Sequence, residues 1–119
     1  MKKDNVVLEK SFAFAIKVVK LYKYLIENKR EYVLSKQFLR SGTAVGALVR
    51  EAQNAESKAD FVHKLAIAQK ECDETIYWIE LMKETFFITE NEFKEIHNYA
   101  HELLKIIRSI ILTTKQNTS

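Results

Sequence analysis

The scarcity of chain-breaking residues is the feature that most limits what this sequence can fold into. The 119 residues contain no proline and only two glycines, Gly42 and Gly46. Tight turns and strand ends usually depend on these two residue types, whereas alanine, leucine, isoleucine, glutamate and lysine, which abound here, favour helix. A chain of this length forms one domain with a real core. We therefore expect a single all-α domain over residues 1–119.

Capping signals divide the chain into four helical segments. Ser57 is followed three residues later by Asp60, and Thr89 by Glu92, so each pair can satisfy free N–H groups at a helix start. Ser35 is a plainer N-cap candidate. These signals predict helices over residues 8–29, 35–55, 57–86 and 89–114. Short connections between long helices favour an up-and-down antiparallel four-helix bundle.

Each segment carries an apolar stripe at spacings of three and four residues, as expected for a helix with one face in a core. The stripes predict these core positions: Leu8, Phe12, Ala15, Val19, Tyr22 and Ile26; Leu34, Phe38, Ser41, Val45, Leu48 and Ala52; Phe61, Leu65, Ala68, Cys72, Ile76, Ile79 and Phe86; Phe93, Ile96, Ala100, Leu104, Ile107 and Ile111. The single cysteine, Cys72, is therefore expected to be a buried, unreactive thiol, in agreement with a reducing compartment.

The last two segments carry more apolar side chains than one bundle core requires. Second stripes are formed by Tyr99, Leu103, Ile106 and Ile110 and by Ile67, Trp78, Leu81 and Met82. Surplus apolar surface favours self-association, and a broad core-facing arc with scattered exposed aliphatic residues is the alternative. The two glycines lie one turn apart on one flank of residues 35–55, where a neighbouring helix can approach closely. We expect helix or subunit contacts at these positions: Gly42, Gly46, Trp78, Leu81, Tyr99, Ile106 and Ile110.

Basic residues give the second segment an outer face opposite its core stripe. Arg40 and Arg50 lie about 15 Å apart along a helix, a span that suits two phosphate contacts. An ordinary solvated face is the alternative. With a net charge of only +3, any attraction to nucleic acid would depend on local clustering of cations. Lys36, Arg40 and Arg50 are the candidate nucleic-acid-binding residues.

No cluster of residues predicts catalysis or cofactor binding. His97 and His101 have the i, i+4 spacing that can bind zinc, but no third ligand is apparent, so no metal is expected. The acidic residues 71, 73 and 74 lack a histidine partner at matched spacing and are interpreted as a solvated edge. No apolar run approaches the ~20 residues that span a bilayer, and the N-terminus does not read as a signal peptide. We expect a cytoplasmic, non-enzymatic protein with no membrane contact.

A longer pattern in the middle of the chain resembles a known family. Residues 35–52 read SKQFLRSGTAVGALVREA, and Ser57, Asp60-Phe61 and the run ECDETIYWI at 71–79 follow. This pattern resembles the four-helix bundle proteins encoded within intervening sequences of bacterial 23S rRNA genes. That family is related to accessory proteins of diversity-generating retroelements. Arg40 and Arg50 match basic positions of its second-helix motif, and Glu51 matches the acidic one.

The resemblance implies ring-shaped homopentamers and, in the related branch, nucleic-acid binding through basic residues. Together with the residue patterns it predicts a homo-oligomer, of five copies, that binds RNA, DNA or a nucleic-acid enzyme. A structural or protein–protein interaction module without nucleic-acid binding is the alternative. Titrations at several salt concentrations would separate the two, because phosphate neutralisation makes log affinity fall linearly with log salt.

Overall fold

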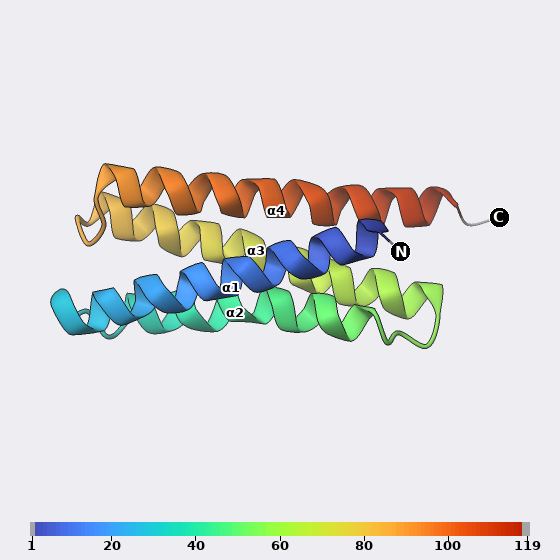
Figure 1. Cartoon of the computed structure of the whole chain (residues 1–119), viewed down its shortest axis with the longest axis horizontal. Coiled ribbons are helices and arrows are strands. Elements are labelled where there is room, and N and C mark those ends of the chain that lie inside the picture. Colours follow the sequence, from blue (N-terminus) through green and yellow to red (C-terminus); the bar gives the residue numbers. More distant parts are fainter. Residues whose placement is uncertain (1, 118–119) are drawn as a thin grey trace.

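The computed structural model describes the backbone of residues 2–117 and the side chains of residues 6–117. Within that part of the chain lie four helices: α1 (Lys2–Asn28), α2 (Leu34–Ala52), α3 (Lys58–Glu84) and α4 (Glu90–Gln116). Consecutive helices run antiparallel and side by side along a rod of 51 × 21 × 20 Å (Figure 1). The contact between α1 and α4 is the least extensive of the four helix contacts. The predicted all-α antiparallel bundle is confirmed.

Two helix starts follow from the capping chemistry seen in the sequence. The Ser57 hydroxyl accepts a hydrogen bond from the Asp60 amide at 3.0 Å, directly before α3. Thr89 accepts from the Glu92 amide at 3.1 Å, and the Glu92 carboxylate accepts from the Thr89 amide at 2.8 Å, which completes a capping box before α4. Both starts are confirmed. The first helix, however, begins at Lys2 rather than near residue 8.

The prediction that Ser35 caps α2 is wrong. Ser35 lies inside the first turn, fully buried, and its hydroxyl donates back to the Glu31 carbonyl at 2.6 Å. The Glu31 carboxylate is the cap instead: it accepts hydrogen bonds from the amides of Val33, Leu34 and Ser35 at 3.0, 2.9 and 2.6 Å. A carboxylate outside the helix thus satisfies three N–H groups that the first turn leaves without partners.

The predicted core stripe of the first helix is also wrong. The buried residues of α1 form a neighbouring stripe, namely Val7, Ser11, Phe14, Val18 and Leu25. The predicted positions form an outer stripe (Leu8, Phe12, Ala15, Val19, Tyr22 and Ile26) that is only partly buried, and Phe12 is 58% exposed. Both stripes have helical spacing, so the packing of α2 and α4, rather than the sequence period, decides which one enters the core.

The stripes of the other three helices agree better with the prediction. Most of the expected positions of α2, α3 and α4 are buried, including Cys72, whose burial raises the pKa of its thiol to about 12. Phe86 is the exception, with 88% of its surface exposed and a φ of 67° just after α3. No glycine is available at this helix end, and Phe86 takes the left-handed conformation that glycine usually supplies. None of the helices in residues 2–117 is long and apolar enough to cross a membrane.

Candidate functional site

Arg40 does not present a free cation to solvent. Its guanidinium donates to the Glu71 carboxylate at 3.3 Å and to the Glu74 carboxylate, both on α3. Trp78 donates its indole N–H to Glu74 at 3.0 Å, so Arg40, Glu74 and Trp78 form one network across the α2–α3 seam. The Trp78 hydrogen bond, more than the Arg40 charge, lowers the pKa of Glu74, and the hydrogen bond to Glu74 raises the pKa of Arg40. Residues 71 and 74, predicted as a solvated acidic edge, instead anchor an arginine.

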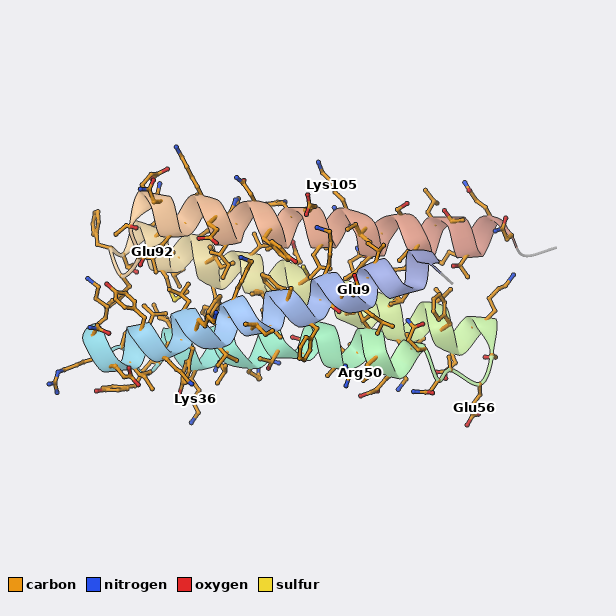
Figure 2. The ribbon with its side chains drawn as sticks, viewed as in Figure 1. Glu9, Lys36, Arg50, Glu56, Glu92 and Lys105 are labelled. Carbon is orange, nitrogen blue, oxygen red and sulfur yellow. The ribbon has the colours of Figure 1, made fainter. Side chains whose placement is uncertain are left out.

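Lys36 and Arg50 lie on the same side of the bundle as Arg40 but keep their charges exposed. They are fourteen residues apart, which corresponds to about 21 Å along α2. Both residues are exposed and lie on the α2 side of the molecule (Figure 2). No carboxylate of the described side chains forms an ion pair with either residue. Two of the three predicted cations are therefore available to a phosphate.

Arg50 also borders a shallow hollow between α1 and α2. The residues that line it are Leu8, Phe12, Ala15, Thr43, Gly46, Ala47, Arg50, Glu51 and Asn54. The guanidinium of Arg50 lies 6.0 Å from the centre of the Phe12 ring, within the range of a cation–π contact. Small side chains on α2 leave the ring of Phe12 uncovered. The outer stripe of α1 and the basic face of α2 thus meet along one surface.

Both predicted glycine contacts are made within the chain, by α1. A Cβ added at Gly42 would lie 2.7 Å from a methyl of Val18, and one added at Gly46 would lie 3.1 Å from the carbonyl oxygen of Ser11. Neither distance leaves room for a side chain without movement of α1. The glycines therefore set how closely α1 approaches α2.

Most residues of the second apolar stripes of α3 and α4 pack inside the bundle itself. Leu103 and Met82 are fully buried, and Trp78, Tyr99, Ile106 and Ile110 pack partly buried against the core. Leu81 is partly buried as well. Five large apolar side chains are exposed within the described helices: Tyr77 lies on α3 and Leu112 on α4, and the other three, Val6, Phe12 and Ile16, lie on α1. The apolar surplus that predicts a partner is therefore concentrated on α1, a signal available in the sequence as a helix with two apolar stripes.

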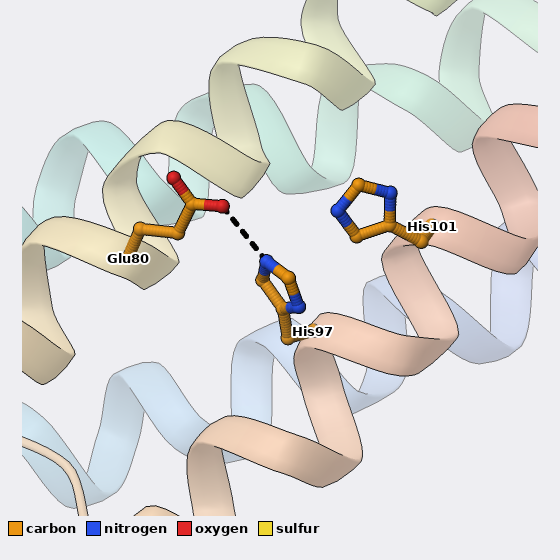
Figure 3. Close-up of side chains that lie close together, drawn as sticks. All are labelled: Glu80, His97 and His101. Atoms are coloured by element: carbon orange, nitrogen blue, oxygen red, sulfur yellow. Dashed lines mark hydrogen bonds and ion pairs between the residues drawn. The ribbon is translucent and has the colours of Figure 1, made fainter.

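One further cluster involves a residue that sequence reasoning missed. Glu80 of α3 lies beside His97 and His101 of α4, and one ligand atom from each of the three falls within 4.8 Å of the others (Figure 3). The third ligand that the sequence lacked is thus supplied across the α3–α4 seam. Seventeen residues separate Glu80 from His97, so spacing alone could not connect them.

The model of the 23S rRNA-intervening sequence protein family matches residues 3–109. A crystal structure of a protein with unknown function from the S23 ribosomal protein family of Bacteroides thetaiotaomicron is 51% identical; the alignment covers 92% of this chain and 97% of that one, with a TM-score of 0.90. No curated protein matches. On the family match over most of its length, the chain belongs to the 23S rRNA-intervening sequence protein family.

Proposed function

We propose that this protein is a non-enzymatic homo-oligomer that presents the exposed cations of α2 to RNA or DNA, or to an enzyme bound to nucleic acid. The observation that carries this proposal is the contrast on α2: Arg40 is neutralised by two carboxylates, whereas Lys36 and Arg50 are exposed and form no ion pair with any described carboxylate.

Assembly is needed because one chain offers too few cations. Two phosphate contacts per chain give weak binding at physiological salt, but repetition of the same pair around a closed oligomer raises the effective affinity through avidity. The outer stripe of α1 is the surface that best supports assembly, since Phe12 is 58% exposed and half-buried apolar residues surround it. Five copies are the number that the family resemblance implies.

Light scattering coupled to size exclusion tests the assembly. We expect a mass near five times the 13.9 kDa of one chain, and we expect Phe12→Ser to reduce it. Tyr77→Ser is the matched control, because Tyr77 is an exposed aromatic residue (56%) on α3, away from the outer stripe. A wild-type protein that runs as a monomer at micromolar concentration would contradict the assembly and the repeated basic surface together.

Titration of a labelled mixed-sequence oligonucleotide at several salt concentrations tests the binding surface. The double variant Lys36→Ala/Arg50→Ala should bind more weakly and with a shallower salt slope, because fewer phosphates are neutralised. The control is Lys94→Ala/Lys105→Ala, which removes the same charge from exposed positions of α4. Lys105 lies on the side of the bundle opposite α2 (Figure 2), and Lys94, about three helical turns earlier, lies on the same face of α4. Equal loss of affinity in both double variants would show that net charge, and not the α2 face, governs binding.

The second candidate is a protein–protein interaction module without nucleic-acid binding. The pairing of Arg40 with Glu71 and Glu74 favours it, because an arginine that already pairs with two carboxylates contributes little to phosphate binding. Failure of the wild-type protein to bind oligonucleotide at low salt would establish this alternative over the first.

A further inference from the structure

Three metal-ligating side chains meet on the outside of the α3–α4 seam, away from α2. His97 Nε2 lies 2.8 Å from a carboxylate oxygen of Glu80, and the rings of His97 and His101 are 4.5 Å apart between their centres, inclined by 63°. Figure 3 shows the Glu80 carboxylate and the His101 ring on either side of His97, with a nitrogen of His101 turned toward the pair. The arrangement is open to solvent on one side, because Glu80 and His101 are exposed.

His97 is held in place from the opposite side. Its ring stacks on Phe93 at 4.5 Å between centres, with an angle of 27° between the planes, and only 20% of its side chain is exposed. A stacked, largely buried imidazole keeps its direction without a bound ligand, which is the kind of positioning that metal sites require of their central ligand. An ion pair between two helices would need only Glu80 and His97. His101, which makes no hydrogen bond within the described part of the chain, adds a second imidazole to the same point.

We propose that Glu80, His97 and His101 bind one divalent transition-metal ion, with zinc as the best match. Two imidazoles and one carboxylate are a common zinc donor set, and histidines at i, i+4 on one helix can share an ion. Ligand atoms about 2.0–2.2 Å from a tetrahedral ion lie roughly 3.4 Å apart. The Glu80 oxygen and His97 Nε2, now 2.8 Å apart, would therefore move slightly apart to admit the ion, and any pair of ligand atoms near the 4.8 Å limit would move closer together. The two exposed ligands can make that movement by side-chain rotation. Water would complete the coordination on the open side.

The site is independent of the proposed nucleic-acid surface. It is formed by α3 and α4, whereas Lys36 and Arg50 lie on α2, which packs against α1 and α3 but not against α4. Metal binding can therefore be present or absent whatever the outcome of the oligonucleotide titrations.

Calorimetric titration of Zn²⁺ into the metal-free chain, without a histidine tag and in a non-chelating buffer, tests the proposal. We expect saturable binding of one ion per chain and a rise in melting temperature, because the ion binds the folded chain preferentially. Glu80→Gln and His101→Ala should each weaken binding at least about tenfold, since loss of an outer-shell partner alone costs 10–100-fold. Both changes are at exposed positions, and circular dichroism checks that the helices remain intact.

The chain supplies its own matched control. It contains three histidines, and the third, His63, lies exposed on α3 outside the cluster. His63→Ala should bind Zn²⁺ as the wild type does, and Mg²⁺, which prefers oxygen ligands, should not compete at equal concentration. Absence of saturable binding at ~100 μM Zn²⁺ would overturn the proposal. Unchanged Zn²⁺ affinity in Glu80→Gln would also overturn it, because the carboxylate would then not be a ligand. A loss of Zn²⁺ affinity in His63→Ala equal to that in His101→Ala would overturn it as well.

Discussion

Substitution of Gly42 by alanine should destabilise the bundle, although alanine is the better helix former. A Cβ at this position would lie 2.7 and 2.8 Å from the two methyls of Val18 and 3.2 Å from its Cβ. Carbon atoms pack best at ~3.5–4.0 Å, so the new methyl is about 1 Å too close. Val18 is fully buried and β-branched, which leaves it essentially one side-chain rotamer in a helix. Relief therefore requires α1 to move away from α2.

The magnitude is the difference of two opposing contributions. Overpacking of a well-packed core costs about 1–3 kcal/mol, and the double methyl clash favours the upper end. Replacement of a helical glycine returns about 1 kcal/mol through helix propensity. The net expectation is about 2 kcal/mol of lost stability. For 119 residues the entropy of unfolding is ~0.25 kcal/mol/K, so the melting temperature should fall by about 8 °C.

Thermal unfolding followed by circular dichroism, at one fixed protein concentration, measures this effect. Ala47→Gly, at an exposed position of the same helix, calibrates the propensity contribution and should lower stability by about 1 kcal/mol. In the double variant Gly42→Ala/Val18→Ala the new methyl enters the space that valine leaves, so the total cost should be smaller than the sum by about 1–2 kcal/mol. A higher melting temperature for Gly42→Ala, or simple additivity in the double variant, would refute the close contact.

Three further predictions concern the helix ends and the core. Burial alone would raise the pKa of Glu31, but three backbone N–H donors outweigh it and lower the pKa below the ordinary 4.5. A folded-state pKa below the unfolded one adds stability above pH ~4.5 that is lost as pH falls through the folded value, so Glu31→Gln should be less stable than wild type at pH 7, and the gap should narrow at pH 3. Phe86→Gly should stabilise the chain by up to about 1 kcal/mol, because glycine adopts a φ of 67° without a Cβ clash. Thr75→Val should cost about 1–2 kcal/mol, because it breaks the buried 2.8 Å hydrogen bond between the hydroxyls of Thr75 and Ser41.

Each of these has a control in the same measurement. Urea unfolding at pH 7 and pH 3 compares Glu31→Gln with Glu27→Gln. Glu27 is an exposed glutamate at the end of α1, so its variant should have nearly the unfolding free energy of the wild type at either pH. If the free-energy difference between wild type and Glu31→Gln is the same at both pH values, the carboxylate cap is excluded. Phe86→Ala keeps the left-handed strain and should not be stabilising, so a gain equal to that of glycine would point to the removed aromatic ring. Ser41→Ala combined with Thr75→Val should recover part of the loss, and no recovery would argue against a coupled pair.

What the sequence predicted correctly rests on local chemistry. Ser57 and Thr89 each accept a hydrogen bond from an amide three residues later, which is the spacing of a standard N-cap. Both helix starts could therefore be predicted from the sequence. The cap of α2 was missed because Glu31 uses a longer side chain from outside the helix, a pattern that standard N-cap residues do not cover. Local rules therefore predicted the elements well and their exact ends less well.

What the sequence could not predict depends on which helices meet. Two apolar stripes on α1 have the same period. The stripe that contains Phe14 is buried in the core, and the predicted stripe, which contains Phe12, lies outside it. The pairing of Arg40 with Glu74 and the approach of Glu80 to His97 both cross a helix seam, over 34 and 17 residues of sequence. The position of each candidate charge was thus predictable, but its partner was not.

The contact between α1 and α4, the least extensive of the four, affects how the chain folds and fluctuates. Every extensive helix contact joins neighbours in the sequence, a topology of low contact order that is typical of folding in microseconds to milliseconds. The α1–α4 seam is the only long-range closure among the described helices, and exposed ion pairs such as Lys10–Glu102 and Lys17–Glu95 add little to it. Transient opening should therefore begin there, and amide hydrogen exchange should be faster in α1 than in the central turns of α3, which pack against helices on both sides.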